Sequence, residues 1–207
     1  MGMRMVVLVV VIAAAAVSLA AQAVRLEPLD ARGRVTYFIS EGEPGSGYRA
    51  SDRELAVWAL KDWERSAGGR IRLVESLRQD ALILVNFAGA QGGNYGEMRP
   101  IDVNGRRGAE VFIRPDTDSL GPDIGGMARA DPLMRDTIVY LTCVHELGHA
   151  LGLNHTANDA DIMYFFGFGG DIPGFFRRYR AQIKERGDIA RVAGVSVSDV
   201  ATLRRLY

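Results

Sequence analysis

All three histidines of this 207-residue chain fall within one short window, HELGHALGLNH, from His145 to His155. On an α-helix, residues four apart share a face and lie about 6 Å apart along the axis, so His145 and His149 can direct ring nitrogens at one ion. Gly152 lacks a Cβ, so it can take a positive φ, end the helix and turn the chain until His155 approaches the same point. The window therefore predicts a helix that ends in a glycine turn and carries a three-histidine metal site.

Three imidazole ligands fit Zn²⁺ and leave a fourth position open to water, which is typical of a catalytic rather than a structural ion. Glu146 is turned about 100° from His145, so its carboxylate is expected beside the ion and not on it. There it could accept a proton from a water molecule whose pKa the zinc lowers, and return it to a leaving amine. The pattern predicts one catalytic zinc ion and hydrolysis of peptide bonds.

The same window resembles the extended zinc motif of the metzincins and is most similar to that of matrixins, the matrix-metalloprotease type. In that family a methionine turn follows the third histidine and forms an apolar floor beneath the zinc. The sequence Asp161-Ile162-Met163-Tyr164 resembles this turn. The resemblance implies that Met163 is its methionine.

The resemblance extends over most of the chain and implies an α+β metzincin (zincin-like) fold. A mixed twisted sheet and the zinc-binding helix would form an upper lobe over residues 24–155. A small, mostly helical lower lobe would follow over 156–207, with the Met-turn and the terminal helix. A substrate cleft would run between the lobes.

Matrixins bind substrate by adding it as a strand to an exposed sheet edge. The resemblance makes the AEVFI segment the candidate edge strand, with Ala109, Glu110, Val111, Phe112 and Ile113 as candidate substrate-binding residues. Tyr164 is expected in the specificity pocket or the core. Residues 165–168 (FFGF) stand where the family has proline, so we expect a reshaped pocket that prefers an apolar residue just after the scissile bond.

Apolar patterning predicts the elements that such a fold requires. We expect strands at 34–40, 71–75, 81–87 and 109–113, and helices at 51–65, 136–151 and 196–207. Ser51 and Glu54 form a capping-box pattern at the first of these helices, and Ser196 to Asp199 can cap the last. The glycine-rich residues 89–96 are expected as a surface connection.

Residues 114–132 contain four aspartates among glycine and proline and are expected as a loop. A calcium ion is compatible with such oxygen ligands, but their spacing matches no calcium-loop template, and solvated loop carboxylates are commoner. Calcium binding therefore has no support from the sequence.

The N-terminus predicts export. Arg4 precedes an apolar run, which is followed by Ala21-Gln22-Ala23, so residues 1–23 resemble a secretory signal peptide cleaved after Ala23. The alternative is a retained anchor helix, but the apolar run is shorter than the roughly 20 residues that a membrane span needs. We expect an extracellular or periplasmic protein with no stable membrane association after cleavage.

The charge balance, with 25 basic and 25 acidic side chains, gives no electrostatic case for nucleic acid or anionic membrane as a main partner. Cys143 is the single cysteine, so no disulfide can form within the chain, and we expect a small buried side chain there. The expected partner is a protein or peptide substrate.

The favoured function is thus a secreted zinc endopeptidase, and two alternatives stay open. A zinc-holding adhesion or binding module without turnover would be expected to lack Glu146, which is present. A zinc hydrolase of a non-protein amide, such as a cell-wall crosslink, would use the same metal chemistry in a different cleft.

Overall fold

The computed structural model describes residues 26–29, 33–89 and 94–207, and the predicted signal peptide at 1–23 lies outside them. Five strands occur in the described residues: β1 Arg34–Ile39, β2 Arg72–Glu75, β3 Ile83–Phe87, β4 Gly96–Val103 and β5 Arg106–Ile113. The α-helices are α1 Asp52–Ser66, α2 Pro122–Ala130, α3 Pro132–Ala150, α4 Ile172–Arg180 and α5 Val197–Leu206. Short 3₁₀ turns are η1 Arg78–Asp80, η2 Thr117–Leu120, η3 Phe166–Phe168 and η4 Arg186–Ala190.

The strands form one mixed sheet in the order β2-β1-β3-β5-β4. The first four in this order pair in parallel, whereas β4 pairs antiparallel with β5 and forms one edge. This arrangement confirms the expected α+β class with a mixed sheet. The alternating strand β1 buries Val35, Tyr37 and Ile39, as its period-two pattern predicts.

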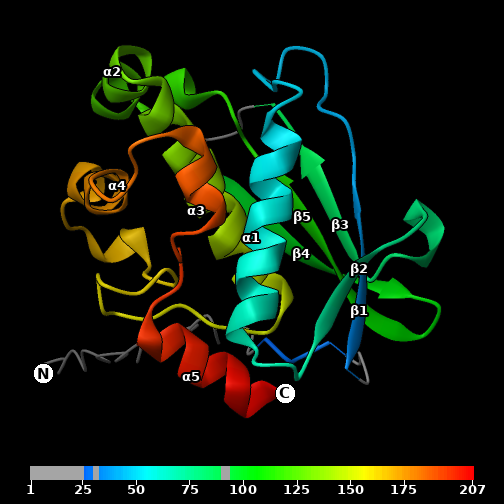
Figure 1. Ribbon diagram of the computed structural model, residues 1–207. Coiled ribbons are helices and arrows are strands. Elements are labelled where there is room, and N and C mark those ends of the chain that lie inside the picture. The colour runs from blue at the N-terminus through cyan, green and yellow to red at the C-terminus, as the bar shows by residue number, and fades with distance from the viewer. Residues whose placement is uncertain (1–25, 30–32, 90–93) are drawn as a thin grey trace, which may run out of the picture.

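Helices α1 and α3 pack side by side against the sheet (Figure 1). The Trp63 indole of α1 is fully buried and donates a hydrogen bond of 2.8 Å to the Val144 carbonyl of α3. Cys143 is buried beside it, as expected. Each large apolar side chain buried in this layer contributes about 1.5–3 kcal/mol, so helix α3 is anchored in the core of the molecule. Within the described residues, no helix combines the length and apolar character that crossing a bilayer requires.

The expectation of a loop over 114–132 is wrong. That segment contains η2 and α2, and α3 begins at Pro132 rather than near Asp136 or Thr137. Both helices begin with proline, which the first helical turn accepts because its N–H would lack a partner there. Asp131 caps α3 by accepting a hydrogen bond of 2.9 Å from the Leu133 N–H. Pro122 and Pro132 therefore begin helices and do not mark a loop.

The expectation of an edge strand at 109–113 is also wrong. Those residues lie in β5, between β3 and β4, and Ala109, Val111 and Ile113 are fully buried. The edge strand is β4, which begins at Gly96 inside the expected glycine-rich connection. Its sequence carries Pro100, which a sheet tolerates at an edge.

The two expected helix caps have different outcomes. At α5, the Ser196 hydroxyl accepts from the Asp199 N–H and the Asp199 carboxylate accepts from the Ser196 N–H, both at 3.1 Å, so the cap is confirmed. At α1, Ser51 has helical dihedral angles and makes no side-chain cap bond. The Glu54 carboxylate instead pairs with Arg186 at 2.5 Å.

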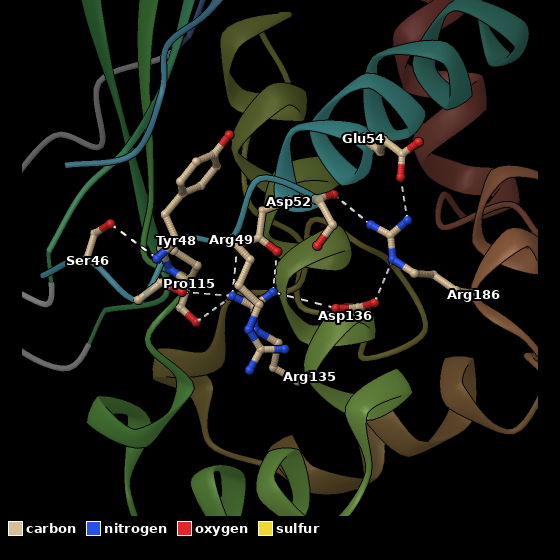
Figure 2. A network of polar contacts seen from close by, with 11 residues as sticks. Ser46, Tyr48, Arg49, Asp52, Glu54, Pro115, Arg135, Asp136 and Arg186 are labelled. Atoms are coloured by element: carbon tan, nitrogen blue, oxygen red, sulfur yellow. Dashed lines mark hydrogen bonds and ion pairs between the residues drawn. The ribbon is translucent and has the colours of Figure 1, made fainter. Parts of the chain in front are cut away.

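A polar network joins the start of α3 to the rest of the fold (Figure 2). The Arg135 guanidinium pairs with Asp52 of α1, with both side chains almost wholly buried, and donates to the Pro115 carbonyl at 3.3 Å. Its neighbour Asp136 accepts from Arg186 at 2.9 Å. Because a buried charge needs a partner, this network fixes α3 relative to α1 and to the chain that follows α4.

Candidate metal centre

Helix α3 ends where the glycine turn was expected. Gly152 has a φ of +98°, and the Leu153 N–H donates to the Gly148 carbonyl at 3.0 Å, which closes the helix end. A Cβ on Gly152 would lie 2.8 Å from the backbone of Glu27, so the position requires glycine for space as well as for dihedral angle. The turn sends the chain back toward the helix and brings His155 under it.

The three histidines converge through one nitrogen each. The Nε2 atom of His155 lies 3.3 Å from that of His145 and 3.1 Å from that of His149. Among the described residues, these three side chains form the single group of His, Cys, Asp or Glu residues that could hold a metal ion. The spacing of the sequence window therefore corresponds to a real cluster in space.

The outer nitrogens are held by the backbone. His145 Nδ1 lies 2.7 Å from the Ile162 carbonyl and His149 Nδ1 lies 2.8 Å from the Leu153 carbonyl. Each Nδ1 must carry the proton to make that bond, so each Nε2 presents a lone pair to the centre. Burial, together with the neighbouring histidines, lowers the pKa of His145 to about 3, and burial lowers that of His149 to about 4. Neutral, oriented imidazoles fit the requirements of a zinc ligand set.

Glu146 lies beside this cluster and is almost buried, with 7% of its surface exposed. Burial raises the pKa of its carboxyl to about 8, with the Arg114 charge opposing this shift and Glu97 adding to it. A Cβ on Gly96 would lie 2.6 Å from Glu146 Cγ, so the carboxylate packs directly against the first residue of β4. The arrangement places a buried carboxyl group with a shifted pKa next to the first of the three histidines, which is a feature common at functional sites.

Met163 packs against helix α3 at Gly148. Its side chain is fully buried, and its sulfur lies so close to Gly148 that a Cβ there would overlap it. The Met163 carbonyl accepts from the Thr156 N–H at 2.8 Å, which ties the turn to the residue after His155. The turn thus packs against the helix between the two histidines that the helix carries.

Two acidic residues that hold this turn were not expected to contribute to the site. The Asp199 carboxylate accepts from the Ile162 N–H at 2.8 Å, and Asp161 accepts from the Ser196 hydroxyl at 2.8 Å. Asp199 is 1% exposed although it caps an ordinary helix. Capping alone explains an aspartate at this position, and the sequence carries no separate signal that Asp199 also holds the turn at Ile162.

A cavity of about 580 Å³ opens beside the histidines. Its walls are mostly aromatic and aliphatic and include Leu141, Ile162, Tyr164, Phe165, Phe166, Phe175 and Phe176. Tyr164 therefore lies where it was expected, with its hydroxyl donating to the Gly169 carbonyl at 2.8 Å. None of the five candidate residues in β5 lines the cavity, whereas Gly96, Glu97 and Met98 of β4 do.

The four aspartates of 114–132 mostly have local roles. Asp116 and Asp131 cap η2 and α3, Asp118 pairs with Arg129, and Asp131 also pairs with Arg180 at 2.7 Å. These bonds account for the position of each of the three carboxylates without a bound ion.

The chain is similar in sequence to several known proteins. Macrophage metalloelastase of Oryctolagus cuniculus is 32% identical over 139 residues, which are 63% of this chain and 27% of that protein. Stromelysin-1 of Mus musculus is 30% identical over 64% of this chain and 27% of its own length. For Matrix metalloproteinase-20 of Homo sapiens the identity is 28%, over 67% of this chain and 27% of that protein.

The chain spans just over a quarter of the length of these curated relatives. The matrixin family matches it over residues 30–168, from before β1 to the end of η3 and including every histidine. This chain belongs to the matrixin family.

Proposed function

We propose that this chain is a secreted zinc-dependent endopeptidase in which His145, His149 and His155 bind the zinc and Glu146 is the general base. The observation that carries the proposal is the convergence of three Nε2 atoms within 4.8 Å of one another, next to a buried carboxylate. Names of the relatives, which include a metalloelastase and a metalloproteinase, support the same reaction class.

When bound, zinc would polarise the scissile carbonyl and lower the pKa of a water molecule beside it. Glu146 would take one proton from that water as it attacks the carbonyl carbon, and would deliver it to the amine nitrogen when the C–N bond breaks. Burial raises the pKa of this carboxyl in the metal-free chain, and a zinc ion bound beside it would oppose that shift and favour the carboxylate. The nearby Arg114 charge favours the ionised form that must act first.

The substrate would bind as an added strand on β4, since this strand and not 109–113 forms the edge beside the cavity. The side chain just after the scissile bond would enter the cavity between Leu141 and Phe176, with Tyr164 in its wall. Because this wall is apolar, we expect preference for an apolar residue at that position.

Casein hydrolysis by the zinc-loaded protein that lacks residues 1–23 tests the proposal. The rate is compared in the presence and in the absence of a chelator. The variant Glu146→Ala should keep stoichiometric zinc, because the carboxylate is not a ligand, and should lose activity by a factor on the order of a thousand or more. Glu75→Gln, on the opposite edge of the sheet, is the matched control and should keep full activity. Unchanged hydrolysis by Glu146→Ala would contradict the mechanism, and release of amines from cell-wall material with no cleavage of casein would contradict the substrate class.

Export rests on the N-terminal sequence pattern. Expression with residues 1–23 in a secreting host should release a protein whose first residue is Val24, and N-terminal sequencing of the exported material checks this. Retention of Met1 in a membrane fraction would instead indicate an anchor.

A further inference from the structure

Two of the large apolar side chains exposed in the described residues lie next to each other at the rim of the cavity. Phe168 is 64% exposed and Phe165 is 41% exposed, whereas Leu77 and Val197, the other two, lie apart from them in the chain. Exposed apolar patches at a cavity rim commonly mark binding surfaces. We name Phe165 and Phe168 together the aromatic shelf.

The shelf is built directly on the metal centre. The Phe165 ring packs over the His155 ring, with centroids 4.7 Å apart and planes inclined by 35°. Phe168 stands edge-on to Phe165, at 5.2 Å and 90°. One face of the shelf therefore contacts a histidine of the cluster, while Phe168 presents its surface to solvent.

The backbone beneath the shelf is fixed by short-range hydrogen bonds. The Phe165 N–H donates to the Thr156 carbonyl at 3.2 Å, and the Phe168 N–H donates to the Phe165 carbonyl at 3.0 Å. Gly167 leaves room for the Phe165 ring, which a Cβ at that position would overlap. A surface that is already ordered loses little conformational entropy when a ligand binds.

We propose that the aromatic shelf is a second specificity subsite, which binds an aromatic or large aliphatic side chain of the substrate on the His155 side of the scissile bond. It adjoins the cavity between Leu141 and Phe176 and shares Phe165 with its wall, whereas Phe168 does not line that cavity, so each subsite takes a different substrate residue. This inference rests on the proposed function. The substrate is the occupant because the shelf continues the wall of the cavity, to which Phe165, Gly167 and His155 all contribute.

Peptide substrates that vary at one position at a time test the shelf. For the zinc-loaded wild-type protein, the ratio of kcat/KM for phenylalanine over glycine should be high at two positions, one for each subsite. Phe168→Ala should lower that ratio about tenfold at the shelf position, and leave the ratio at the cavity position unchanged. Phe168→Lys should shift the preference at the shelf position toward glutamate. Leu77→Ala, an exposed apolar residue near the opposite edge of the sheet, should change neither ratio.

Zinc content and thermal midpoint of each variant show whether the metal centre and the fold are kept. Unchanged ratios in both Phe168 variants would overturn the shelf. If the kcat/KM ratios stay unchanged while the Phe168 variants lose vesicle binding or self-association, the shelf binds a membrane or a second copy of the chain. That result would also overturn the proposal. Zinc-loaded wild-type protein that cleaves no peptide at all would contradict the proposed function itself, which is a distinct result.

Discussion

The two walls of the metal cavity differ in what fixes their structure. On one wall, helix α3 positions His145 and His149 by its own periodicity, and Gly152 makes the turn that returns His155. On the other wall, two of the aromatic residues after Met163 are held by a partner distant in sequence. Phe166 and Phe176 pack against Tyr95, at centroid distances of 5.9 and 5.5 Å. The first wall follows from local geometry, whereas the second depends on how distant segments meet.

Of the predictions that compare the two walls, the largest change in kcat is expected where the helix wall contacts the edge strand. Glu146 belongs to the helix, but its carboxylate packs against Gly96 at the start of the edge strand. In Gly96→Ala the added Cβ would lie 2.6 Å from Glu146 Cγ and 2.9 Å from the Phe112 carbonyl oxygen, so the carboxylate must move. We expect kcat to fall about a hundredfold, because misplacement by about 1 Å has effects of this size. We also expect KM to rise, because Gly96 begins the strand that the substrate would join.

Gly126→Ala is the matched control for that experiment. Gly126 lies in α2, and an added Cβ would meet nothing within 4 Å. This variant should keep its kcat and gain roughly 0.5–1 kcal/mol in stability from helix propensity. If Gly96→Ala keeps the wild-type kcat, the edge strand does not position Glu146.

The second prediction concerns how the free energy of unfolding of the metal-free protein depends on pH, through the histidines of the helix wall. Burial holds the pKa of His145 near 3 and that of His149 near 4 in the folded chain, against about 6.5 when unfolded. As pH falls from about 6.5 toward 4, the unfolded chain therefore binds more protons than the folded chain, and the free energy of unfolding decreases. The loss should reach up to about 1.4 kcal/mol per pH unit for each histidine.

Urea unfolding of the metal-free protein across this pH range measures the slope. His149→Asn should show a smaller slope, because one of the three histidines whose pKa burial lowers is gone. An identical slope in both proteins would mean that other groups dominate the acid response.

The third prediction tests the contact between the helix and the Met-turn. In Gly148→Ala the new Cβ would overlap Met163 Sδ and lie 3.0 Å from the Trp63 ring. Overpacking costs about 1–3 kcal/mol, against a gain of roughly 1 kcal/mol in helix propensity. We expect a net loss of up to about 2 kcal/mol in the free energy of unfolding.

A double-mutant cycle with Met163→Ala separates overpacking from other causes. Removal of the methionine side chain should relieve the overlap, so the two changes together should destabilise less than the sum of the single changes. Additive losses would show that Gly148 and Met163 are not coupled.

The sequence predicts best what short-range geometry determines. The His145–His155 spacing, the positive φ at Gly152 and the buried alternation of β1 all depend on residues close in the chain, and the structure confirms each. The edge strand could not be found this way, because the alternation of 109–113 is the same in an inner strand as at an edge. Pairing with β4, not the pattern of β5, decides which strand is exposed.

Prolines caused the other main error. Pro122 and Pro132 suggested a loop, although each begins a helix whose capping residue stands immediately before it. The sequence signal was present at Asp131, since an aspartate followed by proline and an apolar run is typical of a helix start. The unexpected helix α4 begins similarly, with the Asp171 carboxylate accepting from the Gly174 N–H at 2.8 Å.

The smallest expected effect distinguishes two serines with nearly the same local pattern. Ser196 caps α5 and also donates to Asp161, so Ser196→Ala should lower the free energy of unfolding by about 1 kcal/mol. Ser51 makes no side-chain cap bond at α1, where Asp52 instead accepts from the Arg49 N–H at 2.8 Å. Ser51→Ala should therefore change the stability by less than about 0.5 kcal/mol. Urea unfolding of both variants measures the difference, and equal losses would mean that the pattern, and not the tertiary contacts of Asp52, decides which serine caps its helix.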